Sequence, residues 1–304
     1  MKITREEEFT AAIAEQIATN PPVVEFSKNG VDEAYRRLGR DGVALLKSKG
    51  FLGYDFEKYY VIERFLNSLG ITEKADDKYL SAVFSSSAKF SAKQFRGDPY
   101  LKIIKVLSAR EGDFLLTESS YERGEIFQYD MPDLSSSYIV PKLGFLTESA
   151  TFPTIYEGNV PWMSVCPSEI YSMKPHVLAA SGRVLVLGLG LGYFPFMISR
   201  KSEVKSIVIV ELREEVIKIF NDHILPQFPF KEKIEVVRAD ALKYLASTAD
   251  GQFDYCFADI WENQFDGAVY YKEIKPFEEK LPSTRFSYWI EKEILFELER
   301  QKTL

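Results

Sequence analysis

The chain has 304 residues, 46% of them hydrophobic, which is enough to bury a sizeable core in about two domains. Its formal charge of −7 argues against a nucleic-acid partner, because affinity for phosphate backbones rests on clusters of Lys and Arg. The polar start of the chain lacks the apolar run of a signal peptide or membrane span, so we expect a cytoplasmic protein with no membrane partner. The only cysteines, Cys166 and Cys256, have no metal-ligand spacing, and no metal is expected.

Helical signals dominate the first third of the chain. The stretch Thr4-Arg-Glu-Glu7 is a capping-box pattern, and residues 54–69 form an aromatic amphipathic stripe. Further on, Asp98-Pro99 supplies an N-cap and a first-turn proline for another helix. We predict a helical amino-terminal domain over residues 1–112, which serves for packing, for covering a substrate site or for dimerisation.

Short β-type runs separated by turn residues follow over residues 113–168. The last two runs flank Gly158-Asn159, a two-residue hairpin signal. We therefore predict a small antiparallel β segment between the helical domain and the remainder of the chain.

An apolar run from Val184 to Leu187 ends in three alternating glycines, Gly188, Gly190 and Gly192. A run without polar alternation is typical of a central parallel strand, and glycines let a backbone approach a ligand closely. A dinucleotide fingerprint would need its third glycine at position 193, which is Tyr193, and no Gly-Lys-Ser/Thr of a P-loop follows. The pattern indicates a cofactor of another nucleotide type.

Three further strand-like runs each end in an acidic residue, which is Glu211, Asp240 or Asp259. Helical patterns lie between the runs, so the order βαβαβαβ predicts a doubly wound parallel sheet. Glu211 follows the first glycine by about 20 residues, where open α/β sheets present an acid to a ribose. Two alternatives stay open: Glu211 as a solvated strand-end acid, and Asp240 as the N-cap of the helix that starts at Ala241.

The glycine loop and the strand-end acids together resemble the class I S-adenosylmethionine-dependent methyltransferases. The resemblance implies that the loop passes under the methionine portion of the cofactor, that Glu211 holds the ribose and that Asp240 binds the adenine amino group. It also implies that Asp259 lies where the reactive sulfonium meets its acceptor. The cofactor-binding residues expected on this basis are Gly188, Gly190, Gly192, Glu211, Asp240, Ala241, Asp259 and Glu169.

A narrower resemblance includes Glu169, which precedes the first glycine by 19 residues and follows the β segment. This arrangement looks like the spermidine synthase branch of the superfamily, whose members transfer an aminopropyl group from decarboxylated S-adenosylmethionine to putrescine. That branch carries Asp-Ser-Ser-Asp-Pro after its fourth strand, whereas this chain has Asp259-Ile-Trp-Glu262-Asn. The two acids keep their spacing, but the serines and the proline are missing, so the acceptor stays unassigned.

The fold expected for residues 169–304 is a Rossmann-like methyltransferase domain that lacks the last strands of the family. One more strand pattern, Arg285 to Ile290, and a closing helical pattern are all that remain of the sequence. A sheet edge left open in this way would favour a homodimer.

Group transfer from a sulfonium is an in-line displacement, so the protein has mainly to position the acceptor and to keep an amine acceptor unprotonated. We expect Asp259 and Glu262 to be the catalytic pair that orients or deprotonates a small-molecule acceptor of a methyltransferase, although Glu262 could also be a solvated loop acid. An aminopropyltransferase that uses the decarboxylated cofactor is an alternative. So is a non-catalytic protein that keeps the fold as a cofactor-binding scaffold.

Overall fold

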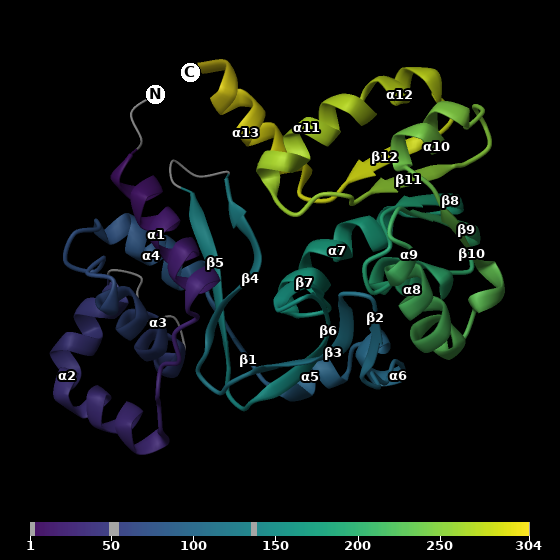
Figure 1. Ribbon diagram of the computed structural model, residues 1–304. Coiled ribbons are helices and arrows are strands. Elements are labelled where there is room, and N and C mark those ends of the chain that lie inside the picture. Colours follow the sequence, from purple (N-terminus) through teal and green to yellow (C-terminus); the bar gives the residue numbers. More distant parts are fainter. Residues whose placement is uncertain (1–3, 49–54, 135–138, 304) are drawn as a thin grey trace. The chain divides into compact units, whose positions relative to one another are not determined.

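The computed structural model describes residues 4–48, 55–134 and 139–303 (Figure 1). The chain forms two compact units, each built from two segments. The first unit consists of Met1–Gln94 and Ser120–Ala150, and the second of Phe95–Ser119 and Thr151–Leu304. No helix in the described part of the chain is long and apolar enough to cross a membrane.

The first unit combines helices with a small sheet. Three of its helices start at side-chain caps: Thr4 forms the predicted capping box of α1, Asp55 caps α3 and Asp76 caps α4. The sheet has the order β1-β5-β4, with β1 parallel and β4 antiparallel to β5. The elements of this unit are α1 (Arg5–Thr19), α2 (Lys28–Ser48), α3 (Phe56–Ser68), α4 (Asp77–Ser86), β1 (Ala88–Phe90), β4 (Ile126–Asp133) and β5 (Val140–Leu146).

The unit boundaries differ from the predicted ones at residues 112 and 168. Strand β5 pairs with β1 and with β4, both strands pack against α1, and β5 also packs against α4, so residues 120–150 belong with the amino-terminal helices. Residues 95–119 instead belong with the carboxyl-terminal part of the chain. These assignments depend on strand pairing between distant segments, which local periodicity does not reveal.

The second unit contains a four-stranded sheet of order β2-β3-β6-β7, in which β2–β3 and β6–β7 are antiparallel. The turn between β6 and β7 is the predicted hairpin at Gly158, whose φ of +61° suits glycine. Its strands are β2 (Ala109–Glu111), β3 (Phe114–Tyr121), β6 (Ala150–Glu157) and β7 (Val160–Ser164).

The second sheet of this unit is parallel and has the order β10-β9-β8-β11-β12. The strand order reverses between β8 and β11, which makes the carboxyl ends of these two strands the switch point where open α/β sheets bind ligands. All four residues of β11 and the last four of β8 are buried, so both faces of the sheet centre are covered. The strands are β8 (Gly182–Leu187), β9 (Val204–Glu211), β10 (Ile234–Arg238), β11 (Tyr255–Ala258) and β12 (Arg285–Tyr288).

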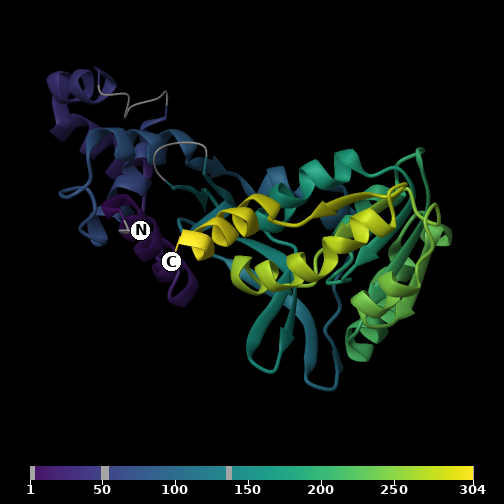
Figure 2. The same ribbon diagram turned by 90° about the horizontal axis from the view of Figure 1, so that it is seen from above.

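Helices connect these strands, and α11 and α13 pack side by side (Figure 2). The main helices of the unit are α6 (Pro99–Ile103), α7 (Pro167–Ala179), α8 (Tyr193–Ser199), α9 (Glu214–Ile219), α10 (Ala241–Ser247), α11 (Gln264–Ile274), α12 (Pro276–Lys280) and α13 (Glu291–Thr303). A short helix, α5 (Ala92–Arg96), spans the boundary between the units. The predicted parallel α/β sheet and separate antiparallel sheet are confirmed, and no sixth strand of the parallel sheet occurs in the described residues.

Candidate functional site

A cavity of about 1010 Å³ opens at the switch point of the parallel sheet. Its size is in the range of sites for nucleotide-like cofactors and small molecules. Its wall combines the loops after β8, β9, β10 and β11 with α7, β7 and α11. The sequence-predicted site residues on this wall are Glu169, Gly188, Gly190, Glu211, Asp240, Ala241, Asp259 and Glu262.

The three glycines of the loop all have positive φ, at +96°, +54° and +73°. A Cβ on Gly188 would collide with the main-chain carbonyl of Asp259, and one on Gly192 would collide with the ring of Phe220. Gly192 is the N-cap of α8 and is not among the residues that line the cavity. The glycines therefore serve packing inside the protein, and Gly188 and Gly190 additionally face the cavity.

Two tyrosines hold the glycine loop from α6 and α8. The hydroxyl of the fully buried Tyr100 donates a hydrogen bond of 2.5 Å to the carbonyl of Leu191, and its burial raises its pKa. The hydroxyl of Tyr193 donates one of 3.0 Å to Asp98, which also caps α6. The sequence shows Asp98 as a cap, but its link to Tyr193 joins residues almost a hundred positions apart and has no local signal.

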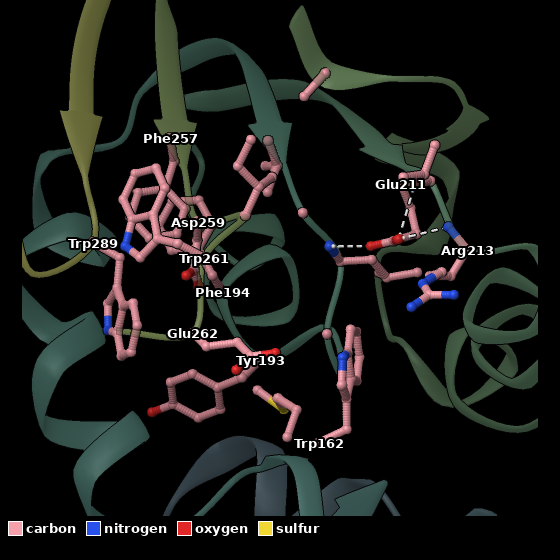
Figure 3. Close-up of a pocket in the computed structure, with 18 of the residues that line it drawn as sticks. Trp162, Tyr193, Phe194, Glu211, Arg213, Phe257, Asp259, Trp261, Glu262 and Trp289 are labelled. Carbon is pink, nitrogen blue, oxygen red and sulfur yellow. Dashed lines mark hydrogen bonds between the residues drawn. The ribbon is translucent and has the colours of Figure 1, made fainter. Parts of the chain in front are cut away.

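Glu211 ends β9 as predicted and is only 7% exposed. One of its carboxylate oxygens accepts a hydrogen bond from the peptide N–H of Leu189 at 3.1 Å. The other oxygen accepts from the N–H groups of Leu212 and Arg213 at 2.7 and 2.8 Å (Figure 3). The buried charge is thus satisfied by three backbone donors, and Glu211 ties the glycine loop to the turn after β9.

Asp240 is the N-cap of α10, accepting a hydrogen bond of 2.9 Å from the N–H of Lys243. The capping alternative raised by the sequence is therefore present in the structure. Asp240 and Ala241 also line the cavity, so capping does not remove them from a possible binding surface.

Asp259 follows β11, and its N–H donates to the carbonyl of Leu187 at 2.9 Å, which joins the two central loops. Burial raises the pKa of Asp259 to about 7. Glu169, in the first turn of α7, lies near enough that burial and the charge of Asp259 raise its pKa well above the ordinary value. The cavity therefore brings together two carboxyl groups that share an unfavourable environment for charge.

Glu262 is exposed on the loop after β11 and lines the cavity. Its backbone N–H donates a hydrogen bond of 2.9 Å to Asp266, which forms a capping box with Asn263 at the start of α11. The loop that carries the predicted catalytic pair is thus fixed by the next helix.

Carboxylates outnumber basic groups on the cavity wall by seven to one. In the described part of the chain, the single basic residue on this wall is Arg213, which lies 3.4 Å from Glu157 and over the ring of Phe114. The seven acidic residues are Glu157, Glu169, Glu211, Asp240, Asp259, Glu262 and Asp266.

All three tryptophans of the chain also line this cavity. Trp289 donates a hydrogen bond of 3.0 Å from its indole N–H to Ser172 on α7, and Trp162 packs edge-on against Phe114. Trp261 is 6% exposed, and its indole nitrogen has no hydrogen-bond partner in the described structure. From the sequence, Trp261 and Trp162 are only weak pocket candidates and Trp289 is not one, so the position of all three at one site comes from the tertiary structure.

The sequence matches no protein-family model, and a search of curated proteins finds no match. Among solved structures, the chain is similar to a precorrin-8w decarboxylase from Methanobacterium thermoautotrophicum, with 18% sequence identity and a TM-score of 0.33. The similarity covers 43% of this chain and 68% of the decarboxylase. The chain is also similar to a spermidine synthase from Thermotoga maritima, with 14% sequence identity and a TM-score of 0.38. This similarity covers 65% of this chain and 62% of the synthase.

Proposed function

We propose that the protein is an S-adenosylmethionine-dependent methyltransferase that acts on a small-molecule acceptor. The observation that carries the proposal is the joint position of the glycine loop, Glu211 and Asp259 around one cavity at the switch point of a parallel sheet. The cavity can hold a nucleoside at the Glu211 side, and its many carboxylates suit a cofactor that carries a sulfonium charge.

Each predicted residue has a task in this proposal. The backbone of Gly188 and Gly190 would contact the methionine portion, Glu211 the ribose, and Asp240 with Ala241 the adenine. Glu169 would face the sulfonium side together with Asp259. Gly192 would act indirectly, by allowing the packing against Phe220 that shapes the loop.

The bound cofactor would supply an already activated methyl group, so the chain's own residues need mainly to orient and desolvate the acceptor. Asp259 and Glu262 would orient the accepting atom, and a carboxylate of this pair would take its proton when that atom is a nitrogen. The raised pKa of Asp259 makes its carboxylate a stronger proton acceptor than an ordinary aspartate.

One observation favours a second candidate, which is aminopropyl transfer from the decarboxylated cofactor. Among the described residues, no basic side chain apart from Arg213 lines the cavity to bind the carboxylate of a methionine group, and the acidic wall would repel that carboxylate. A cofactor without that carboxylate would avoid the repulsion.

Isothermal titration calorimetry tests the proposal. The wild type should bind S-adenosylhomocysteine, and Glu211→Gln should bind it at least about tenfold more weakly, because the ribose and the loop both depend on this carboxylate. The matched control is Glu235→Gln, an exposed acid on β10 that does not line the cavity. The absence of binding to folded wild type would reject the proposal.

Comparison of the affinities for the two methyl or aminopropyl donors then separates the two candidate functions. Tighter binding of S-adenosylmethionine than of its decarboxylated form supports methyl transfer, and the reverse order supports aminopropyl transfer. Cofactor binding without transfer to a panel of amines, phenols and carboxylates would favour the non-catalytic alternative.

A further inference from the structure

Two carboxyl groups on the cavity wall, those of Glu169 and Asp259, lie close together and have no other polar partner. Neither side chain makes a hydrogen bond or ion pair with any residue in the described ranges, and both are partly buried. Burial disfavours the charged form of both groups, and two neighbouring carboxylates also repel each other. The pKa of Asp259 is raised to about 7 and that of Glu169 well above its ordinary value, so the pair keeps at least one proton at neutral pH.

In the described part of the wall, no basic side chain stands beside this pair to favour its charged form. Figure 3 shows Arg213 at one side of the site, and Asp259 with Trp289 at the other. Arg213 is also engaged by Glu157 at 3.4 Å. Glu262, on the same loop as Asp259, is exposed, so water solvates its charge. This end of the cavity therefore presents a protonated carboxyl pair together with one solvated acid.

Aromatic side chains that are held in place form the wall on the same side. The rings of Phe194 and Phe257 are both almost fully buried, and their centroids lie 4.2 Å apart (Figure 3). Trp289 is fixed by an indole hydrogen bond of 3.0 Å to α7, and Tyr193 by a hydroxyl hydrogen bond of 3.0 Å to Asp98. Aromatic rings bind another flat ring edge-to-face or offset-stacked, and rings of fixed orientation lose little entropy on binding.

We propose that the acceptor is an uncharged phenol, whose ring lies among these aromatic side chains and whose hydroxyl is bound by Glu169 and Asp259. The proposal rests on the proposed function, since it names the class of molecule that receives the methyl group. A hydroxyl both donates and accepts a hydrogen bond, and a carboxyl pair that shares a proton offers one partner of each kind. An organic anion would add a negative charge beside the pair, and an ammonium ion would meet a carboxyl proton in place of a carboxylate.

The transfer balances with a phenol as acceptor. The hydroxyl proton passes to the carboxylate of the pair, whose pKa of about 7 brings it nearer to that of a phenol, about 10, than an ordinary aspartate would be. A bond forms between the phenol oxygen and the methyl carbon while the carbon–sulfur bond of the sulfonium breaks. The electron pair of that bond stays on sulfur. The products are an aryl methyl ether, a neutral thioether and a neutral carboxyl group.

Three ligands that share one ring but differ in charge test the proposal. With S-adenosylhomocysteine present at neutral pH, calorimetry should show that para-cresol binds at least about tenfold more tightly than para-toluate and para-methylbenzylamine. With S-adenosylmethionine in its place, mass spectrometry should detect the methyl ether of para-cresol. Binding of the amine or of the carboxylate as tight as that of the cresol would overturn the proposal, and so would methylation of the amine in place of the phenol.

Pairs of variants connect the affinity for the hydroxyl to the two carboxyl groups. Glu169→Gln keeps a neutral side chain that donates and accepts hydrogen bonds, whereas Glu169→Met has a similar length and does neither well. Para-cresol should therefore bind at least about tenfold more weakly to Glu169→Met than to Glu169→Gln.

The same comparison between Asp259→Asn and Asp259→Leu keeps the test valid if a Glu169 variant fails to fold. Glu235→Gln, an exposed acid off the cavity wall, is the control and should leave the affinity for para-cresol unchanged. Equal affinities within each pair of folded variants would show that neither carboxyl group binds the hydroxyl, and would refute the proposal.

Two measurements separate this inference from the proposed function. A failure of S-adenosylhomocysteine to bind in calorimetry rejects the proposed function. The titration with para-cresol, repeated on the free protein, still decides whether the carboxyl pair recognises a hydroxyl, because the cavity walls are held by contacts within the chain. A preference of the free protein for the amine would overturn the phenol.

Discussion

Gly188 lies directly against the main chain of Asp259, so that a Cβ at position 188 would overlap the carbonyl oxygen of residue 259. The N–H of Asp259 in turn donates to Leu187 at 2.9 Å. The loop expected to bind the cofactor and the loop expected to meet the acceptor are thus in contact at their first residues. A change in either loop is transmitted to the other.

The first prediction concerns this contact. Gly188→Ala should lower the free energy of unfolding by more than about 2 kcal/mol and weaken S-adenosylhomocysteine binding, because the new methyl group displaces the Asp259 loop. Gly251→Ala is the control, since Gly251 also has positive φ but no atom within 4 Å of its Cβ position. It should cost only about 1 kcal/mol. Urea unfolding and calorimetry measure both effects, and equal losses in the two variants would contradict the explanation.

A second prediction concerns the support of the glycine loop by α6. Tyr100→Phe removes the hydrogen bond to Leu191 and should lower the free energy of unfolding by about 1–2 kcal/mol. Cofactor affinity should fall as well, although Tyr100 does not line the cavity. Tyr244→Phe on α10, also off the cavity wall, should leave affinity unchanged, and a loss of the same size there would argue against the support role.

The third prediction is a pH dependence. Burial raises the pKa of Asp259 to about 7, above its value in the unfolded chain, so the folded state holds a proton that the unfolded state releases between about pH 4 and pH 7. The free energy of unfolding therefore decreases as pH rises through this window.

Asp259→Asn should remove the part of this dependence that comes from Asp259. The variant should match the wild type at pH 4 and exceed it at pH 8 by on the order of 1 kcal/mol, as measured by urea unfolding at both pH values. Glu169, whose pKa is shifted in the same direction, continues to contribute in the variant. A variant that is less stable than wild type at pH 8 would show that Asp259 stabilises the fold as a charged group.

The fourth prediction compares two tryptophans. Trp261→Phe removes a buried N–H without a partner, so the stability regained from this group offsets the loss of ring volume, and the net change should stay within about 1 kcal/mol. Trp289→Phe loses the bond to Ser172 and should cost more. Thermal unfolding ranks the two variants, and the reverse ranking would indicate that the Trp261 nitrogen is engaged in solution.

Much of the fold follows from local patterns in the sequence. The run before Gly188 is a central buried strand, the runs before Glu211 and Asp259 are its parallel neighbours, and the run before Asp240 pairs with the first of these. A continuous apolar pattern suffices for the two central strands, β8 and β11, because a strand segment covered on both faces has no polar positions. The unit boundaries were not predictable in this way, since β4 and β5 join helices from which the sequence separates them.

The sequence by itself determined which acids stand at the ends of parallel strands, and therefore that they gather at one edge of the sheet. Only the tertiary structure decided which of these carboxyl groups have hydrogen-bond partners. Glu211 and Asp240 are satisfied by backbone donors, whereas Asp259 meets Glu169 of α7 in a cavity lined by all three tryptophans. The reason is that the type and order of residues along a strand are local properties of the sequence. The hydrogen-bond partner of an acidic side chain, in contrast, comes from whichever distant segment packs against it.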